Sequence, residues 1–304
     1  MTKKLLAGVI VFLFLSTACI YIFIPSKLEI SHAIPVSYSA MSVARFLEQD
    51  SNWVKWRPSH LSVGGWDFRV GKRLSNITEV ILQKDKAEFP GWLTVVPQAR
   101  IDSASINLEY SLASGWNPVQ RILQYREARS IRAATIYLLD SLRSYLYRKG
   151  PYGIPIRETS TTDSFLIATR SVYSVYPGTH ESYAVLKKLK EYGLEEGAKE
   201  TGYPMLNITQ LSNNEFQMMV AIPVDKAVKP TGNYHSQKLV PGKFLFSEVR
   251  GGMYTVNKSF EEMRNYVTDY QKTTMAIPFQ SLVTDRSAEP DTSKWITRLY
   301  YPVF

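Results

Sequence analysis

The sequence predicts an α+β protein in which one N-terminal transmembrane helix precedes two domains of mixed helix and strand. Three observations predict it. Residues 5–25 form a charge-free apolar segment, residues 126–148 carry a long helical pattern after several strand-like runs, and residues 165–303 contain an internal repeat. The expected boundaries are 1–26 for the anchor, 27–150 for the first domain and 151–304 for the second.

The segment from Leu5 to Pro25 is long enough to cross a membrane, because roughly 20 apolar residues at 1.5 Å each span a bilayer core of about 30 Å. Lys3 and Lys4 precede it, and the positive-inside rule predicts a single-pass protein whose soluble domains lie on the periplasmic or extracellular side. Two alternatives stay open, a cleaved secretory signal and a lipoprotein signal ending at Cys19. Each of the three exports the chain.

The charge distribution limits the classes of partner. The formal net charge is +9, and residues 26–150 hold 17 Lys/Arg against 11 Asp/Glu. This basic excess near the membrane favours anionic lipid head groups, and a diffuse surface excess is the alternative. The charge is not clustered and no DNA-reading motif is present, so no nucleic-acid partner is expected. Because no cysteine follows Cys19, the soluble part has neither disulfides nor thiolate chemistry.

The first domain is expected to be a sheet with one long helix. A strand over 27–37 and a short helix over 39–47 come first, then an exposed aromatic turn that includes Trp53 and Trp56. Further strands are predicted over 66–74, 77–83, 91–97 and 105–112. The closing helix, 126–148, has an apolar face of residues spaced by three and four: Ile131, Ala134, Leu138, Leu142 and Tyr145. A curved antiparallel sheet that grips the helix would bury this face.

The second domain begins after a cluster of helix breakers at 150–155 and contains an internal repeat. The segment 165–168 recurs at 244–247, and 221–224 recurs at 300–303, both with an offset of 79 residues. Each unit opens with a strand and a glycine turn, continues with an amphipathic helix and closes with a hairpin-like pair of strands. The sequence therefore predicts β-α-β-β twice, with both helices on a shared antiparallel sheet.

The bounds of these two helices follow from periodicity and end signals. The first is expected from Thr179 to Tyr192, with Gly193 as its stop. The second is expected to begin at Ser259, which opens a Ser-x-x-Glu capping box with Glu262.

Both domains resemble known families. Residues 27–150 resemble the START-like (SRPBCC, polyketide-cyclase-like) group, through Ile34-Pro35-Val36 before a short helix, the Asn52-Trp53 to Trp56 turn and the long closing helix. The resemblance implies a helix-grip fold around an apolar container.

Residues 156–304 resemble the gyrase-inhibitor-like (SOUL-like) module, which is also the effector-binding domain of AraC- and MerR-type multidrug regulators. The match rests on the duplicated β-α-β-β unit, on 221–224 with the spacer from Asp225 to Gly232, on 240–244 and on the final strand 295–303. The resemblance implies a concave apolar cleft that binds small molecules.

The final strand departs from this family at one position. Members that bind cationic drugs have a Glu where Arg298 stands here, so the resemblance implies a reversed preference for a carboxylate, phosphate or sulfate. The hypothesis is an amphipathic anionic ligand bound near Arg298, and the alternative is that Arg298 pairs with an acid such as Glu248. The candidate ligand-binding residues are Arg298, Trp295, Tyr300, Tyr173, Tyr176, Tyr254 and Met219.

Catalytic signatures are absent from the sequence. The histidines, His32, His60, His180 and His235, lack metal-ligand spacing, and no metalloprotease, nucleophile-elbow or phosphate-loop motif is present. We therefore expect a membrane-anchored, non-catalytic protein that binds an amphipathic small molecule or lipid without a metal or cofactor. The alternatives are a hydrolase or cyclase acting on a hydrophobic small molecule, and a protein-interaction module at the membrane surface. The oligomeric state is left undetermined.

Overall fold

The computed structural model describes residues 2–57, 65–74, 76–161, 164–239, 241–274 and 276–304. The chain divides into two compact units, Met1–Pro151 and Tyr152–Phe304. Mixed helix and antiparallel sheet make up both, and each is described by itself.

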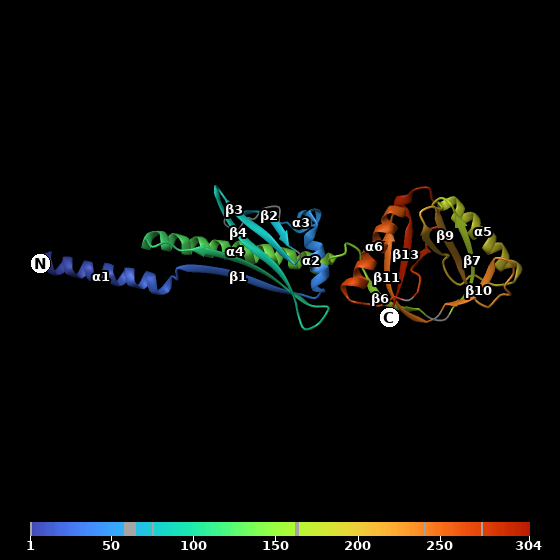
Figure 1. Cartoon of the computed structure of the whole chain (residues 1–304), viewed down its shortest axis with the longest axis horizontal. Helices are drawn as coiled ribbons and strands as arrows, with labels where there is room; N and C mark the ends of the chain where they lie inside the picture. Colours follow the sequence, from blue (N-terminus) through green and yellow to red (C-terminus); the bar gives the residue numbers. More distant parts are fainter. Residues whose placement is uncertain (1, 58–64, 75, 162–163, 240, 275) are drawn as a thin grey trace. The chain divides into compact units, whose positions relative to one another are not determined.

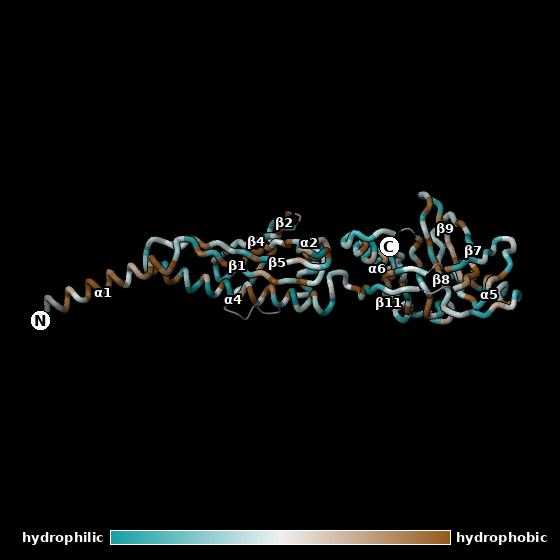
Figure 2. The backbone as a smooth tube through the Cα atoms, turned by 90° about the horizontal axis from the view of Figure 1, so that it is seen from below, coloured by the Kyte–Doolittle hydropathy of each residue, from teal (hydrophilic) through white to brown (hydrophobic). Residues whose placement is uncertain are grey.

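An N-terminal helix, α1 (Thr2–Phe23), precedes the first sheet. By length and composition its segment Leu5–Phe23 is apolar enough to cross a membrane, a test that a signal sequence also passes, and none of it is buried in the protein. Figure 2 shows hydrophobic residues along most of α1.

The sheet of the first unit has the strand order β1-β5-β4-β3-β2, with every neighbouring pair antiparallel. Its strands are β1 (Lys27–Val36), β2 (Asp67–Leu74), β3 (Ile77–Lys84), β4 (Ala87–Pro97) and β5 (Ala104–Ala113). Its helices are α2 (Ala40–Glu48), α3 (Asp50–Trp56) and α4 (Pro118–Lys149). The long helix α4 packs along β1 and β5 (Figure 1).

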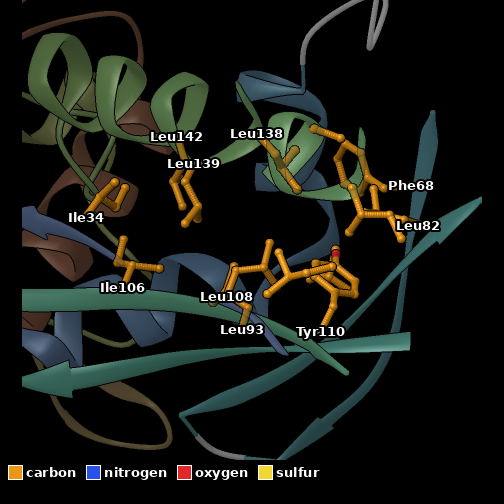
Figure 3. Packing of buried hydrophobic residues seen from close by; sticks show 14 of the residues in the cluster. Ile34, Phe68, Leu82, Leu93, Ile106, Leu108, Tyr110, Leu138, Leu139 and Leu142 are labelled. Carbon is orange, nitrogen blue, oxygen red and sulfur yellow. The ribbon is translucent and has the colours of Figure 1, made fainter. Parts of the chain in front are cut away.

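The space between α4 and the sheet is filled by side chains. Leu138, Leu139 and Leu142 of α4 have no exposed surface, and they face Ile106 and Leu108 of β5 in Figure 3. Full burial of one such side chain stabilises the fold by about 1.5–3 kcal/mol relative to exposure. The apolar face predicted from the spacing of three and four is thus buried, except that Tyr145 is half-buried and stacks on Phe46.

Two predictions for this unit were wrong. The aromatic turn is the helix α3, and its spacing of three puts Trp53 and Trp56 on one face, where they are only 4% and 3% exposed. Trp53 Nε1 donates to the Leu47 carbonyl at 2.7 Å. The helix α4 also begins eight residues before the expected position, because the Asn117 side chain caps its first turn and Pro118 occupies the first helical position.

The second unit is one eight-stranded sheet in the order β10-β7-β9-β8-β12-β13-β11-β6. The strands are β6 (Arg157–Thr161), β7 (Ser164–Tyr173), β8 (Met205–Ser212), β9 (Glu215–Val224), β10 (Tyr234–Leu239), β11 (Gly242–Arg250), β12 (Phe279–Leu282) and β13 (Ile296–Val303). The helix α5 (Thr179–Glu195) packs on β7 and β9, and α6 (Met253–Asp269) packs on β11 and β13.

The two faces of this sheet have different surroundings. The side that we call the helix face carries Ile167, Ile222, Leu245 and Leu299, which form the cores beneath the helices. The opposite side, the open face, carries the alternate residues of the same strands, such as Leu166, Ala221 and Tyr300.

Two sequence signals in this unit were interpreted wrongly. Gly193 lies inside α5 as a close-packing residue, because an added Cβ would stand 3.0 Å from Ile167 Cδ1. Ser259 is also inside a helix, α6, and its hydroxyl donates to the Thr255 carbonyl at 2.7 Å. The last two strands, β12 and β13, pair antiparallel as the predicted hairpin-like pair, and residues 283–295 connect them.

Candidate functional site

The open face of the second unit is hollowed over its centre. Two hollows, of about 300 and 640 Å³, share the side chains of Leu166, Met205, Leu239 and Phe279 and together form one cleft, which we call the open-face cleft. The smaller hollow is lined mainly by apolar residues that include Met219, Ala221 and Pro302.

Aromatic rings form one wall of this cleft. Tyr300 stacks on Phe279 with ring centroids 5.0 Å apart and meets Phe246 edge-on at 5.3 Å. The Phe244 ring lies 6.2 Å from the Tyr300 ring and 6.0 Å from the Phe279 ring, centroid to centroid. These rings come from β11, β12 and β13, and strand alternation places them on one face. The wall presents flat apolar surfaces to anything bound in the cleft.

Charged side chains gather at one end of the cleft. Arg298 lies directly opposite Glu248 in the β11–β13 register, and its Nε donates to Glu248 Oε2 at 2.9 Å. Both side chains are half-exposed, at 37% and 47%. Glu248 raises the pKa of the Arg298 guanidinium by this hydrogen bond, and Arg157 adds a second cation 4.5 Å from the Phe246 ring. Two cations and one anion thus give this end a net positive charge.

The pKa of the Tyr300 hydroxyl is affected by both the aromatic wall and the charged end of the cleft. Burial among the aromatic rings raises the pKa of its hydroxyl, while Arg298 and Arg157 act to lower it. Tyr300 therefore stays neutral at physiological pH and can donate a hydrogen bond at the junction of the apolar and charged parts.

Three of the seven candidate residues lie on the open face. Arg298 and Tyr300 line the larger hollow, and Met219 lines the smaller one. Sequence patterns did not single out Phe246, Phe279 or Arg157 as site residues. Strand alternation could have found part of this set, because Phe244, Phe246 and Glu248 lie on the same face as Arg298 and Tyr300 once β11 and β13 are paired.

The other four candidates lie elsewhere. Trp295 is buried, with its ring 4.9 Å from the Arg286 guanidinium. Tyr173 packs into the core beneath α5, and Tyr176 lies in the turn before α5, where it meets Phe216 at 5.6 Å. Tyr254 is 80% exposed on α6.

No metal site is present among the described residues, since no group of three His, Cys, Asp or Glu side chains there has the necessary arrangement. His32, His180 and His235 lie on β1, α5 and β10. His60 falls outside the described residues.

A further groove of about 1360 Å³ runs along α5. Its floor includes Ile167, Ile222 and Leu282, and its rim carries charges of both signs. Lys190 and Glu200, both on this rim, form an ion pair at 3.0 Å. The charged lining residues balance in formal charge, in contrast with the positive end of the open-face cleft; they are Lys187, Lys190, Lys199, Glu191, Glu200 and Asp285.

The chain was compared with protein families, curated proteins and solved structures. No family model and no curated protein matches it. Among solved structures, the chain is similar to the EcmrR C-terminal domain at 12% identity, with 50% of this chain and 98% of that one covered and a TM-score of 0.44. It is similar to a putative bacterial transcription regulation protein from Staphylococcus aureus at 19% identity, covering 50% and 99%, with a TM-score of 0.32.

A third similar structure is SAV2435 bound to tetraphenylphosphonium, at 18% identity, with 50% and 94% of the two chains covered and a TM-score of 0.34. All three TM-scores are below 0.5. Likeness of this degree carries no inference about function.

Proposed function

We propose that this protein is a membrane-anchored, non-catalytic binding protein for an amphipathic anion, either a small molecule or a lipid, held in the open-face cleft. The observation that carries the proposal is the combination of an apolar, aromatic-walled cleft with a net positive end at Arg298, Arg157 and Glu248.

The cleft suits a ligand with an apolar body and an anionic head. Tyr300 and Phe279 offer ring faces to the body. Glu248 engages the Nε of Arg298, so the two Nη groups of this guanidinium remain to bind a carboxylate, sulfate or phosphate. Among the described residues that line the cleft, Glu248 is the one carboxylate, and its pairing with Arg298 favours binding over acid–base catalysis.

Two probes of nearly equal size and opposite charge test this proposal. Tetraphenylborate and tetraphenylphosphonium present the same apolar rings, so a difference in binding reports the sign of the site. For the detergent-solubilised full chain we expect a larger increase in melting temperature with tetraphenylborate. The variant Arg298→Glu reverses the order, because it replaces the cation by a second carboxylate beside Glu248.

The control is Arg264→Glu, which makes the same change of charge on an exposed position of α6. This variant should keep the preference of the parent chain. Equal responses to both probes in the parent chain, or the same preference in Arg298→Glu and the parent, would contradict the proposal.

Anchoring in a membrane is supported by an apolar surface that continues from α1 onto α4. Tyr21 donates its hydroxyl to the Trp116 carbonyl, and Arg121 donates Nε to the Ile24 carbonyl at 2.8 Å. The Arg121 guanidinium also lies 4.6 Å from the Tyr21 ring. These contacts hold the start of α4 beside the end of α1.

The start of α4 carries the side chains expected at a bilayer surface. Trp116 is 91% exposed, and Val119 and Leu123 are exposed on the first two turns. Arg126 and Arg129 follow within two further turns and are suited to anionic head groups. Tryptophan favours the membrane interface, so this end of α4 would dip into the leaflet beside α1.

Quenching by brominated lipids measures this insertion. In nanodiscs that contain shallowly brominated lipid, Trp116 should give the main quenched component of the fluorescence. The variant Trp116→Phe should remove that component, whereas removal of the buried Trp53 should not. Quenching that is unchanged in Trp116→Phe would contradict insertion at this position.

The two fold resemblances are part of the same proposal. A START-like assignment is supported in the first unit by a five-stranded antiparallel sheet packed along one long helix. A duplicated gyrase-inhibitor-like assignment is supported in the second unit by the symmetry of its strand order. Read inward from one edge, the sheet has β10, β7, β9 and β8; read inward from the other edge, it has the equivalent strands β6, β11, β13 and β12.

The matched strands also refine the repeat. Ile167 pairs with Ile222, and Leu245 pairs with Tyr301, with all four on the helix face. The offset is thus 78 residues for the opening strand (167 to 245) and 79 for the closing one (222 to 301). Phe165 and Phe244 therefore fall on opposite faces of the sheet, since a slip of one residue reverses side-chain direction.

A further inference from the structure

A buried arginine lies on the helix face without an acidic partner among the described residues. Arg286 follows β12 in the 283–295 segment, and its side chain is 6% exposed. Its Nη2 donates to Thr297 Oγ1 at 2.7 Å and to Gln280 Oε1 at 3.1 Å, and its Nη1 contacts Met253 Sδ at 3.3 Å. Every one of these acceptors is neutral.

No acidic side chain in the described part of the chain compensates the charge of this guanidinium, and the Trp295 ring, 4.9 Å away, is its aromatic neighbour. The acids nearest in sequence are engaged with other groups: Asp285 accepts from Ser287, and Glu289 pairs with Lys294. The Nε of Arg286 is buried and has no hydrogen-bond acceptor. Burial lowers the pKa of the guanidinium, yet arginine remains protonated in proteins, so the cation persists in a low-dielectric setting.

A small, partly open cavity adjoins Arg286. Its volume is about 30 Å³, and Tyr176, Gly178, Thr179, Tyr183 and Met253 contribute to its walls. This volume exceeds the roughly 10–15 Å³ that one water needs. It suits a monatomic anion, or the end of a carboxylate, and is too small for a bulky ligand.

The backbone at the cavity also favours negative charge. Gly178 and Thr179 form the start of the 17-residue helix α5, where the helix dipole is positive. The Gly178 amide donates to the Glu181 carboxylate at 2.9 Å, so this end of the helix carries one acid, and the amides that follow Gly178 are those without intrahelical acceptors. Met253, at the start of α6, reaches the Arg286 guanidinium. The buried Arg286 cation and the dipole of α5 thus both favour an anion in this cavity.

We propose that this cavity is an anion site, occupied by a small monoanion such as chloride, which neutralises Arg286. The anion would link the 283–295 segment to the start of α5, to which that segment is already joined by the hydrogen bond from the Arg286 amide to Tyr183 Oη at 2.8 Å. The site lies on the helix face, so it is separate from the open-face cleft.

The test replaces the anion at constant ionic strength. The full chain, purified in sodium gluconate, is transferred to increasing sodium chloride or bromide, because gluconate is too large for the cavity. Hydrogen exchange of residues 283–295, followed by mass spectrometry, should slow with chloride and reach saturation. The melting temperature should rise over the same concentrations.

The variant Arg286→Met keeps a side chain of similar length without the charge, and it should lose both responses to chloride. The matched control Arg264→Met removes an exposed arginine from α6 and should keep them. Equal responses in Arg286→Met and the parent chain would overturn the proposal.

A measurement on the parent chain alone covers the case in which Arg286→Met fails to fold. The ³⁵Cl resonance should broaden in the presence of the protein, and the excess line width should fall as bromide displaces chloride. Absence of both the excess width and the exchange response in the parent chain would equally overturn the proposal.

Discussion

Because Arg298 and Glu248 form an ion pair, we predict that removing the charge of one has the opposite effect on anion binding to removing the charge of the other. A bound anion gains from the guanidinium and is repelled by the neighbouring carboxylate. Arg298→Met should therefore weaken the binding of an amphiphile with a carboxylate head group, such as laurate, and Glu248→Gln should tighten it. Neither change should prevent folding, because a half-exposed ion pair contributes about 0–1 kcal/mol to stability.

The size of the Glu248 effect follows from the geometry. An anion bound by the Nη groups would lie across the guanidinium from Glu248, at roughly 6 Å, about twice the length of a charge-assisted hydrogen bond. Coulomb's law then gives a repulsion of about 0.7 kcal/mol in water and about 2.8 kcal/mol at an effective dielectric constant of 20. Because both side chains are half-exposed, Glu248→Gln should lower the dissociation constant by roughly 3- to 100-fold.

The loss of Arg298 removes a hydrogen bond to a charged group, which is worth about 1.5–3 kcal/mol. Arg298→Met should thus raise the dissociation constant by roughly 10- to 150-fold. Isothermal titration of the detergent-solubilised chain measures both changes, and both should shrink at high salt. Weaker binding in Glu248→Gln, or unchanged binding in both variants, would refute the reasoning.

Three further predictions concern the first unit. Leu138→Ala should lower its free energy of unfolding by about 2–5 kcal/mol in urea denaturation, because Leu138 is fully buried. Tyr110→Phe should instead raise that free energy by about 1–3 kcal/mol in the same assay, since the Tyr110 hydroxyl is buried without a hydrogen-bond partner among the described residues. Trp116→Ser should reduce the protection of the start of α4 from hydrogen exchange in nanodiscs, and equal protection would contradict its insertion.

Periodicity predicted the elements of the first unit that bury a continuous apolar stripe. The stripe through Leu138 and Leu142 indicated α4, and these residues are buried. The first turns of α4 were missed because Val119 and Leu123 are exposed and do not continue the buried apolar face of the helix. The pair Asn117-Pro118 is nevertheless a recognisable signal for a helix start. The burial of Trp53 and Trp56 was missed because two tryptophans beside a proline were interpreted as a turn.

The candidate site was predictable only where strand alternation applies. Arg298 and Tyr300 share the parity of β13 and face the same cleft. Trp295 precedes that strand, so parity does not govern it, and it packs on Arg286 on the helix face. Tyr254 was assigned by composition alone, and its exposure on α6 depends on where that helix begins.

Arg286 shows what sequence patterns do not reveal. It lies in the 13-residue connection, 283–295, between two paired strands, for which the repeat predicted a hairpin-like pair but no loop structure. Its burial depends on contacts with Thr297 and Met253, which are distant in sequence and carry no motif. Only the folded arrangement brings this cation beside the first turn of α5.

Native mass spectrometry of the full chain, released from nanodiscs, tests the central claim most directly. The parent chain should retain an amphiphile with an anionic group. The variant Ala221→Trp, which fills the open-face cleft from β9, should lose this ligand while it keeps its fold. Absence of an anionic adduct on the parent chain, or an identical adduct on Ala221→Trp, would contradict the assignment of the cleft as an anion-binding site.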